Sequence, residues 1–192
     1  MTQWLRGSKE FASDDSFIER TQNIIIGDNK LAAQAALSQA NEEGFYAEIM
    51  TNELQGEASE VGAMLASKLR AEVSRRPRPF CWIAGGETTV RVRGQGKGGR
   101  NQELALSAVD ELRGLENVML IALATDGDDG PTDAAGAVVT GESAQRATTL
   151  GLDAGSSLSR NDAYPFFEAL GDLLKPGPTG TNVNDLIFLI AM

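Results

Sequence analysis

Val118-Met-Leu-Ile-Ala-Leu-Ala-Thr125 is a continuous apolar run that leads directly into the acidic turn Asp126-Gly-Asp-Asp-Gly-Pro-Thr-Asp133. An apolar run of this kind is typical of a strand that is buried on both faces of a sheet. Ligands of α/β proteins bind just beyond the carboxyl ends of such strands. This stretch therefore predicts an α/β fold and places a candidate site at the edge where the strand ends.

The segments before this strand alternate between strand and helix patterns. Strands are predicted at 21–26, 45–50 and 80–84, and helices at 29–43 and 57–75. The order strand, helix, strand is typical of an α/β sheet that contains parallel strands.

The second half of the chain is less regular. Residues 89–93 alternate apolar and basic side chains, as a half-exposed strand does. Further elements are predicted as a helix capped by Asn101 and running to Leu112, helices at 142–150 and 163–170, and a final strand at 186–190. We predict one α/β domain over residues 21–192, with a mixed, mostly parallel sheet and helices on both faces, preceded by a connecting arm at residues 1–20.

Composition excludes several classes of function. The chain has 192 residues, of which 42% are hydrophobic, and a net charge of -10, so neither nucleic acid nor an anionic membrane is expected as a partner. The sequence contains no run of some 20 apolar residues, which is the length that spans a membrane. Cys81 is the only cysteine. We therefore expect a cytoplasmic protein with one buried thiol. Histidine is absent, which excludes Ser-His-Asp and Cys-His catalysis within these residues.

The loop Gly94-Gln-Gly-Lys-Gly-Gly-Arg100 contains four glycines in seven residues. Glycines allow the backbone to direct several amides at one place, and the helix that follows adds its positive end. With Lys97 and Arg100, the loop could hold a phosphate or a carboxylate. The alternative is a flexible connection without a ligand. A dinucleotide-binding turn is rejected because arginines interrupt the preceding strand, and a Walker A loop because Arg100-Asn101 replaces Lys-Ser/Thr.

Three other polar loops follow predicted strands or precede one. The carboxylates of 126–133 could hold Mg²⁺ or accept a hydroxyl proton, or form only a solvated acidic turn. The loop 175–185 is rich in short polar side chains, for which bracing of neighbouring loops is the expected role. In 85–88, Glu87 is expected either to pair with Arg100 or Lys97 or to lie in an ordinary turn. Four such loops at strand ends predict a site on one rim of the sheet.

These loops also carry a family resemblance. Gly85-Gly-Glu-Thr-Thr-Val90, the run from Gly94 to Leu106, the run from Ala124 to Gly136, Asn161-Asp-Ala-Tyr-Pro-Phe-Phe167 and the run from Gly177 to Asp185 follow one another in the order of a known domain. They resemble the MOFRL-type C-terminal domain of class II glycerate 2-kinases. The resemblance extends from about residue 80 to the end of the chain, and residues 26–32 are similar to the stretch that opens this domain.

The resemblance implies a function and a set of site residues. Such enzymes use ATP and a divalent metal, taken as Mg²⁺, to phosphorylate the 2-hydroxyl of D-glycerate in a cleft between two domains. It implies a catalytic role for Arg100 and a weaker role for Asp126 and Asp129 as metal ligands. The residues expected to bind substrate or phosphate are Gly86, Glu87, Lys97, Gly98, Gly99, Asn101, Glu103, Asp126, Gly127, Asp129, Thr181, Asn182, Asn184 and Asp185.

The chain differs from that family in one respect. It has no counterpart of the N-terminal, nucleotide-binding-like domain that carries a catalytic lysine. We therefore expect half of an active site, no tight binding of ATP or Mg²⁺, and no kinase activity from these residues alone. Other functions remain open, namely a hydroxypyruvate reductase, a label often given to relatives, or a non-catalytic module that binds a small acid. A homodimer is also left open.

Overall fold

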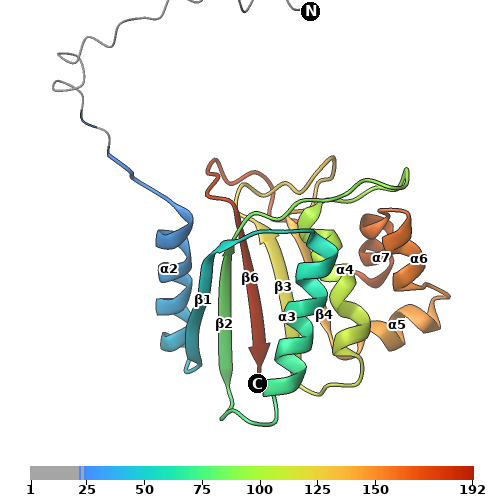
Figure 1. Cartoon of the computed structure of the whole chain (residues 1–192), viewed down its shortest axis with the longest axis horizontal. Coiled ribbons are helices and arrows are strands. Elements are labelled where there is room, and N and C mark those ends of the chain that lie inside the picture. Colours follow the sequence, from blue (N-terminus) through green and yellow to red (C-terminus); the bar gives the residue numbers. More distant parts are fainter. Residues whose placement is uncertain (1–21, 23) are drawn as a thin grey trace, which may run out of the picture.

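The computed structural model describes residue 22 and residues 24–192, which form one α/β domain around a six-stranded sheet (Figure 1). The strand order across the sheet is β1-β2-β6-β3-β4-β5. The strands are β1 (Tyr46–Leu54), β2 (Phe80–Gly86), β3 (Val118–Ala124), β4 (Gly136–Thr140), β5 (Leu173–Leu174) and β6 (Asp185–Ala191). The helices are α2 (Asn29–Glu42), α3 (Ala58–Glu72), α4 (Arg100–Leu112), α5 (Ser143–Thr149), α6 (Ala154–Ser159) and α7 (Ala163–Leu170).

The predicted single α/β domain with a mixed sheet is confirmed, but the sheet is not mostly parallel. Only β1 and β2 pair in parallel, whereas β2–β6, β6–β3, β3–β4 and β4–β5 are antiparallel. The reason lies in β6, which enters between β2 and β3 and runs opposite to both. β2 and β3 run parallel to each other, as the alternating strand and helix pattern predicts. They do not pair with each other, because β6 lies between them.

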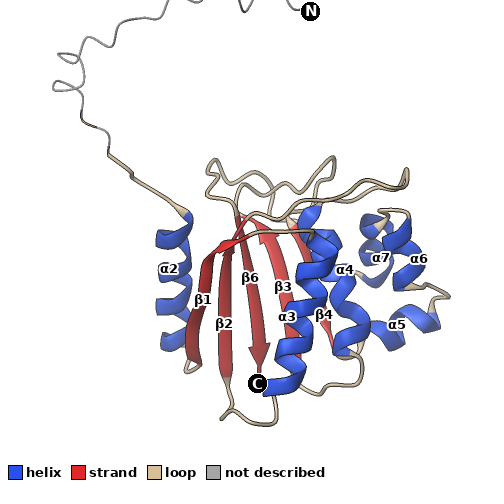
Figure 2. Cartoon of the chain, in the orientation of Figure 1, coloured by secondary structure: helices blue, strands red, loops and turns tan. Residues whose placement is uncertain are grey.

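Helices cover both faces of the sheet, as predicted (Figure 2). On one face α3 and α4 pack against each other and over the central strands, and α5, α6 and α7 lie beyond α4. The larger core fills this side and includes Trp82, Leu120 and Phe167. On the other face α2 packs on β1 and β2, where Cys81 and Ile83 are buried. Burial raises the pKa of the Cys81 thiol to about 11.

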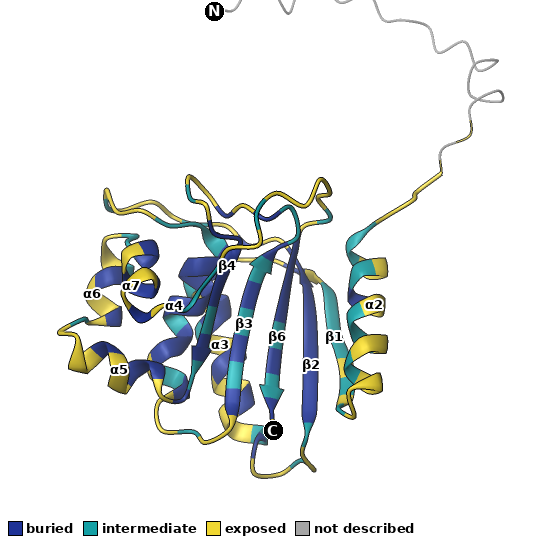
Figure 3. Ribbon diagram, turned by 180° about the vertical axis from the view of Figure 1, so that it is seen from behind, coloured by how far each residue is buried: buried dark blue, intermediate teal, exposed yellow. Residues whose placement is uncertain are grey.

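The central strands are the most buried part of the fold (Figure 3). Every residue of β2 is buried, whereas β3 alternates between buried and partly exposed residues. The alternation shows that one face of β3 contacts the α3–α4 core and the other is only partly covered. The uninterrupted run 118–124 is therefore a strand, as predicted, but it is fully buried on one face only.

Two predicted strands are absent. The part of 21–26 that the structure describes is irregular, and Ile24, Ile25 and Ile26 are 69%, 75% and 94% exposed. β-branched residues favour a strand, but a strand also needs a neighbour with which to pair. Residues 90–93 are extended without a ladder, and a single bridge joins Thr89 to Glu57. The connecting arm predicted at 1–20 lies outside the described residues.

Most of the helices agree with their predicted ranges, whereas some short elements were not predicted from the sequence. The helices α2, α3, α5 and α7 lie within or close to their predicted ranges. The strand β4 and the helix α6 were not predicted, because five and six residues are too few for a clear periodic pattern.

Close contact between α3 and α4 depends on a glycine. A methyl group added to Gly62 would lie 2.0 Å from the carbonyl oxygen of Leu104 and 2.2 Å from Oγ of Ser107. Because α4 carries Arg100 at its first turn, this contact also sets where the candidate site residue stands relative to the sheet.

Replacement of Gly62 by Ala is expected to destabilise the fold by about 1–3 kcal/mol, because the added methyl group forces the two helices apart. Chemical denaturation measures the change. Gly155→Ala is the matched control, since that helical glycine has no atom closer than 3.6 Å to the added methyl group. Equal stability of the two variants would contradict the close packing of α3 on α4.

Candidate functional site

Three polar loops leave the same edge of the sheet (Figure 1). The strands β2 and β3 end at this edge, and β6 begins there, with Asp185 in register with both Gly86 and Ala124. The loops after β2, after β3 and before β6 are therefore neighbours. This arrangement agrees with the predicted convergence of polar loops on one rim.

Arg100 lies at the centre of this edge and forms two ion pairs. Its Nε and Nη2 donate to the Asp185 carboxylate at 2.6 and 2.9 Å, and its Nη1 lies 3.0 Å from Oε1 of Glu87. The hydrogen bonds to Asp185 and the charges of both carboxylates raise the already high pKa of Arg100, against the effect of burial. The guanidinium is therefore a permanent charge held in a fixed orientation.

A cleft of about 560 Å³ opens next to Arg100. Its lining is Glu87, Thr88, Thr89, Val90, Val92, Gly96, Gly98, Gly99, Arg100, Glu103, Asp129, Gly130, Pro131 and Asn161. Six of the predicted site residues are among them: Glu87, Gly98, Gly99, Arg100, Glu103 and Asp129. Val90, Val92 and Pro131 contribute apolar surface to the cleft, and Glu87, Arg100, Glu103 and Asp129 contribute charged groups. The cleft is large enough for a small organic acid together with part of a second ligand.

The conformation of the glycine loop 94–100 is set by hydrogen bonds to residues 160–162. The amides of Gly94, Gly96 and Lys97 donate to Asn161 Oδ1, to the Arg160 carbonyl and to Asp162 Oδ1, respectively. These three amides are therefore not available to an anion. The amides of Gly98, Gly99 and Arg100 are left without an acceptor among the described residues, and these three residues line the cleft.

Asn161 was not predicted as a site residue although it organises the cleft. Its Oδ1 accepts hydrogen bonds from Arg93 and Gly94, and its Nδ2 donates to Glu103 at 2.9 Å. The residue has a positive φ of 54°, a conformation that asparagine tolerates better than most residues. The Asn-Asp pair at 161–162 was visible in the sequence as a turn signal, but nothing local showed that it contacts the glycine loop.

Lys97 does not join Arg100 in the cleft. Its Nζ lies 3.9 Å from the centre of the Tyr164 ring on α7. The Tyr164 hydroxyl donates to Asp133 at 2.7 Å and accepts from Lys175 at 2.7 Å, so the ring is fixed in place. Lys97 thus contacts Tyr164 and is not among the residues that line the cleft with Arg100.

Asp129 provides the cap of α4 from a distant loop. The helix begins at Arg100 after Gly99, one residue before the predicted cap Asn101, and Gly99 has no side chain to accept a hydrogen bond. The Asp129 carboxylate accepts from the amides of Asn101 and Gln102 at 3.1 and 2.9 Å. A methyl group on Gly99 would lie 2.3 Å from Asp129 Cγ, so this cap requires glycine. Asp129 therefore fixes the turn that carries Arg100.

The loop before β6 braces the acidic turn. The Asp126 carboxylate accepts from Asp128 N at 3.2 Å and from Asn182 Nδ2 at 3.0 Å, and the Asn184 carbonyl accepts from Thr125 N at 3.1 Å. The amide of Thr181 lies 3.4 Å from the hydroxyl of Thr179, within the same loop.

Gly127 has a φ of 94° and passes so close to Gly177 that a methyl group would lie 2.1 Å from its carbonyl oxygen. The expected bracing role of 175–185 is thus supported. Gly86 and Asp126 lie at the same edge of the sheet but do not line the cleft.

The two predicted metal ligands do not form a metal centre by themselves. In the part of the chain that the structure describes, no group of three or more His, Cys, Asp or Glu residues could hold a metal ion. Asp129 is 2% exposed, and its oxygens accept helix amides. The Asp126 oxygens are also engaged. A Mg²⁺ ion at this edge would need most of its ligands from water or substrate.

Two carboxyl groups beside the cleft are buried. Burial raises the pKa of Glu103, opposed by the hydrogen bond from Asn161, and burial also raises the pKa of Asp129, opposed by the helix amides. Each carboxyl is thus less easily ionised than in water. With Glu87 and Asp185, which pair with Arg100, they place four carboxyl groups at or beside the cleft, whereas Arg100 is the one cation among its described lining residues.

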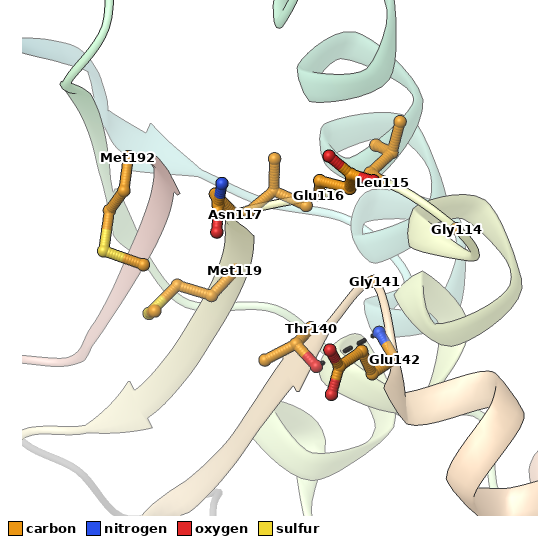
Figure 4. A pocket seen from close by; sticks show the side chains of 10 residues that line it. Gly114, Leu115, Glu116, Asn117, Met119, Thr140, Gly141, Glu142 and Met192 are labelled. Carbon is orange, nitrogen blue, oxygen red and sulfur yellow. Dashed lines mark hydrogen bonds between the residues drawn. The ribbon is translucent and has the colours of Figure 1, made fainter.

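A second hollow lies at the opposite ends of β3 and β6 (Figure 4). It measures about 490 Å³ and contains none of the predicted site residues. Among the described residues that line it, Glu116 and Glu142 are the charged ones, and no lysine or arginine contributes. This hollow is therefore poorly suited to an anionic ligand.

Asp129→Ala is expected to lower the free energy of unfolding by about 1–3 kcal/mol, because two buried helix amides lose their acceptor. Hydrogen exchange should accelerate at the amides of Asn101 and Gln102 before the rest of α4. The exposed neighbour Asp128→Ala serves as the control. Unchanged exchange at both amides would contradict the capping role.

Glu103→Gln is expected to make stability less dependent on pH. A carboxyl whose pKa is raised by folding stabilises the fold below its unfolded pKa, near 4.3, and this contribution is lost as pH rises through the folded pKa. The stability of the variant relative to wild type should therefore increase from about pH 4 toward neutrality. Denaturation at several pH values measures this trend. Glu53→Gln, at an exposed glutamate, is the control. A parallel trend in both variants would refute the assignment.

No helix in the described ranges combines the length and the apolar character needed to cross a membrane.

Comparison with known proteins agrees with this geometry. A family model described as "MOFRL family" matches residues 80–185. The D-glycerate 2-kinase of Thermotoga maritima is 49% identical over 167 residues, which cover 85% of this chain and 40% of that protein. A protein of Agrobacterium vitis named "Putative hydroxypyruvate reductase" is 40% identical over 84% of this chain and 38% of its own length.

A solved structure has the same fold. The crystal structure of a glycerate kinase from Thermotoga maritima superposes with a TM-score of 0.87 and 46% identity, over 89% of this chain and 42% of the other. The chain thus spans about two fifths of the length of the relatives it matches. The matched segment runs from β2 to the first residue of β6 and contains Arg100, Asp129 and the cleft, and this chain belongs to the MOFRL family.

Proposed function

We propose that this chain supplies one side of the active site of a glycerate 2-kinase, which transfers a phosphoryl group from ATP to the 2-hydroxyl of D-glycerate. The observation that carries the proposal is the orientation of Arg100, whose guanidinium is fixed by Asp185 at the edge of an open cleft. Relatives named as glycerate kinases support the same reading.

Phosphoryl transfer requires the kind of group that this cleft offers. The reaction needs few bonds to the protein, because catalysis comes mainly from positioning and from neutralising charge on the phosphoryl oxygens. In our proposal, Arg100 contacts the transferred phosphoryl group or the glycerate carboxylate, and the free amides of Gly98 and Gly99 add further donors. Mg²⁺ would arrive with the nucleotide and supply charge neutralisation there.

The other side of the site is proposed to come from a domain like the part of the relatives that this chain does not cover. The chain matches about two fifths of those proteins. We therefore expect the 192 residues alone to give no D-glycerate-dependent release of ADP. Weak or absent binding of ATP and Mg²⁺ by this chain is part of the same proposal.

Reductase activity is the less favoured alternative. A dinucleotide-binding turn offers the free N-terminus of a helix to the pyrophosphate. Here the amides of Asn101 and Gln102 already donate to Asp129, and the glycine loop follows an irregular segment. The cleft therefore suits a small acid and a phosphoryl group better than a dinucleotide.

A hybrid enzyme tests the proposal. The matched C-terminal region of the Thermotoga maritima D-glycerate 2-kinase is replaced by this chain, and ADP release is measured with ATP, Mg²⁺ and D-glycerate. The hybrid is expected to turn over. Arg100→Gln should lower kcat/KM by at least about 100-fold, because a fixed cation in contact with the transition state is lost.

Arg91→Gln is the matched control, because Arg91 is exposed and does not line the cleft. It should leave turnover close to that of the unmodified hybrid. A hybrid that is folded, reduces hydroxypyruvate with NADH and releases no ADP would overturn the proposal in favour of the reductase. A folded hybrid that binds D-glycerate and shows neither activity would indicate a binding module.

A further inference from the structure

We propose that Glu87 occupies the anion position on Arg100 while the site is empty, and that an incoming anion displaces it while Asp185 keeps the guanidinium in place. The inference rests on the proposed function, because it concerns the anion that Arg100 is proposed to hold. It assigns different roles to the two carboxylates that contact Arg100.

Asp185 is expected to keep its contact with Arg100 when an anion binds. Its side chain is 2% exposed, and both of its carboxylate oxygens accept hydrogen bonds from Nε and Nη2 of Arg100. Its backbone belongs to the first residue of β6, which pairs with β2 and β3, and its carbonyl accepts a hydrogen bond from Asn29 Nδ2 at 3.0 Å. Separation would leave a buried carboxylate without a partner, which is strongly unfavourable.

Glu87 is expected to release Arg100 easily. Its side chain lines the cleft and is 51% exposed, and its Oε1 is 3.0 Å from Nη1 of Arg100. Within the described residues, its carboxylate has no other hydrogen-bond donor. Its backbone amide is anchored to the Leu54 carbonyl at 2.8 Å, so the side chain can rotate without moving the strand. Half-exposed ion pairs of this kind contribute little to stability.

The charges of the cleft make this exchange necessary. While Glu87 pairs with Nη1 of Arg100, its carboxylate occupies the part of the guanidinium that a phosphate would contact. Exchange of one anion for another keeps the charge around Arg100 nearly constant, whereas simple addition would place a further negative group beside Glu103 and Asp129. The entering anion also gains the amides of Gly98 and Gly99, which Glu87 does not use.

The 192-residue chain is titrated with inorganic phosphate at constant ionic strength and followed by ¹⁵N NMR. The backbone amides of Gly98 and Gly99 report phosphate binding in every variant, and the Arg100 Nε–H signal reports the contact with Asp185. Glu87→Gln is expected to bind phosphate about two- to fivefold more tightly, the range for loss of one exposed ion pair. Glu53→Gln, an exposed glutamate beyond the cleft, removes the same charge and should match wild type. Arg100→Gln should abolish the specific binding.

The Arg100 Nε–H signal shows whether Asp185 stays in contact with Arg100 during the titration. In wild type and in Glu87→Gln, the Nε–H resonance should keep the shift of a proton bound to a carboxylate throughout the titration. Asp185→Asn should move that resonance even without phosphate and weaken phosphate binding at least tenfold. If this variant does not fold, the persistence of the signal in Glu87→Gln still tests the role of Asp185.

The outcomes separate the two proposals. If phosphate at millimolar concentration shifts neither the Gly98 nor the Gly99 amide in any variant, the anion site fails and this inference fails with it. If phosphate binds through Arg100 but Glu87→Gln binds as wild type or more weakly, only the exchange is overturned. If Glu53→Gln gains as much as Glu87→Gln, the gain reflects net charge, which also overturns the exchange.

Discussion

The buried ion pair between Arg100 and Asp185 is the interaction on which the candidate site depends. It joins the first residue of α4 to the first residue of β6, and thus connects the helical layer to the centre of the sheet. The cap that Asp129 provides and the close packing at Gly62 both hold α4 in the orientation that this pair requires. The arginine of the candidate site is therefore positioned by contacts from three separate parts of the chain.

Local patterns in the sequence were sufficient for much of the fold. The helix periods, the apolar strands at 80–84 and 118–125 and the buried Cys81 follow from side chains that are close in sequence. The rim was predictable for a similar reason, because each polar loop adjoins a recognisable strand. The pairing of Glu87 with Arg100 was among the stated alternatives and is present.

What the sequence did not reveal depends on long-range contacts. The entry of β6 between β2 and β3 decides the direction of most strand pairs, and no local pattern encodes it. Lys97 is drawn to Tyr164, a residue on another helix, and the loop amides donate to 160–162. Ile24–Ile26 has a strand composition without a partner strand in the described chain. In each case the result depends on whether a distant part of the chain supplies a neighbour, which local sequence does not show.

The place of β6 has a consequence for how the molecule is made. During synthesis the ribosome releases β1 and β2, and then β3, β4 and β5, before the strand that must lie between the two groups. Until residues 185–191 emerge, β2 and β3 lack the strand that lies between them, and Arg100 lacks Asp185 as its partner. Completion of the sheet and formation of the ion pair therefore depend on the same seven residues.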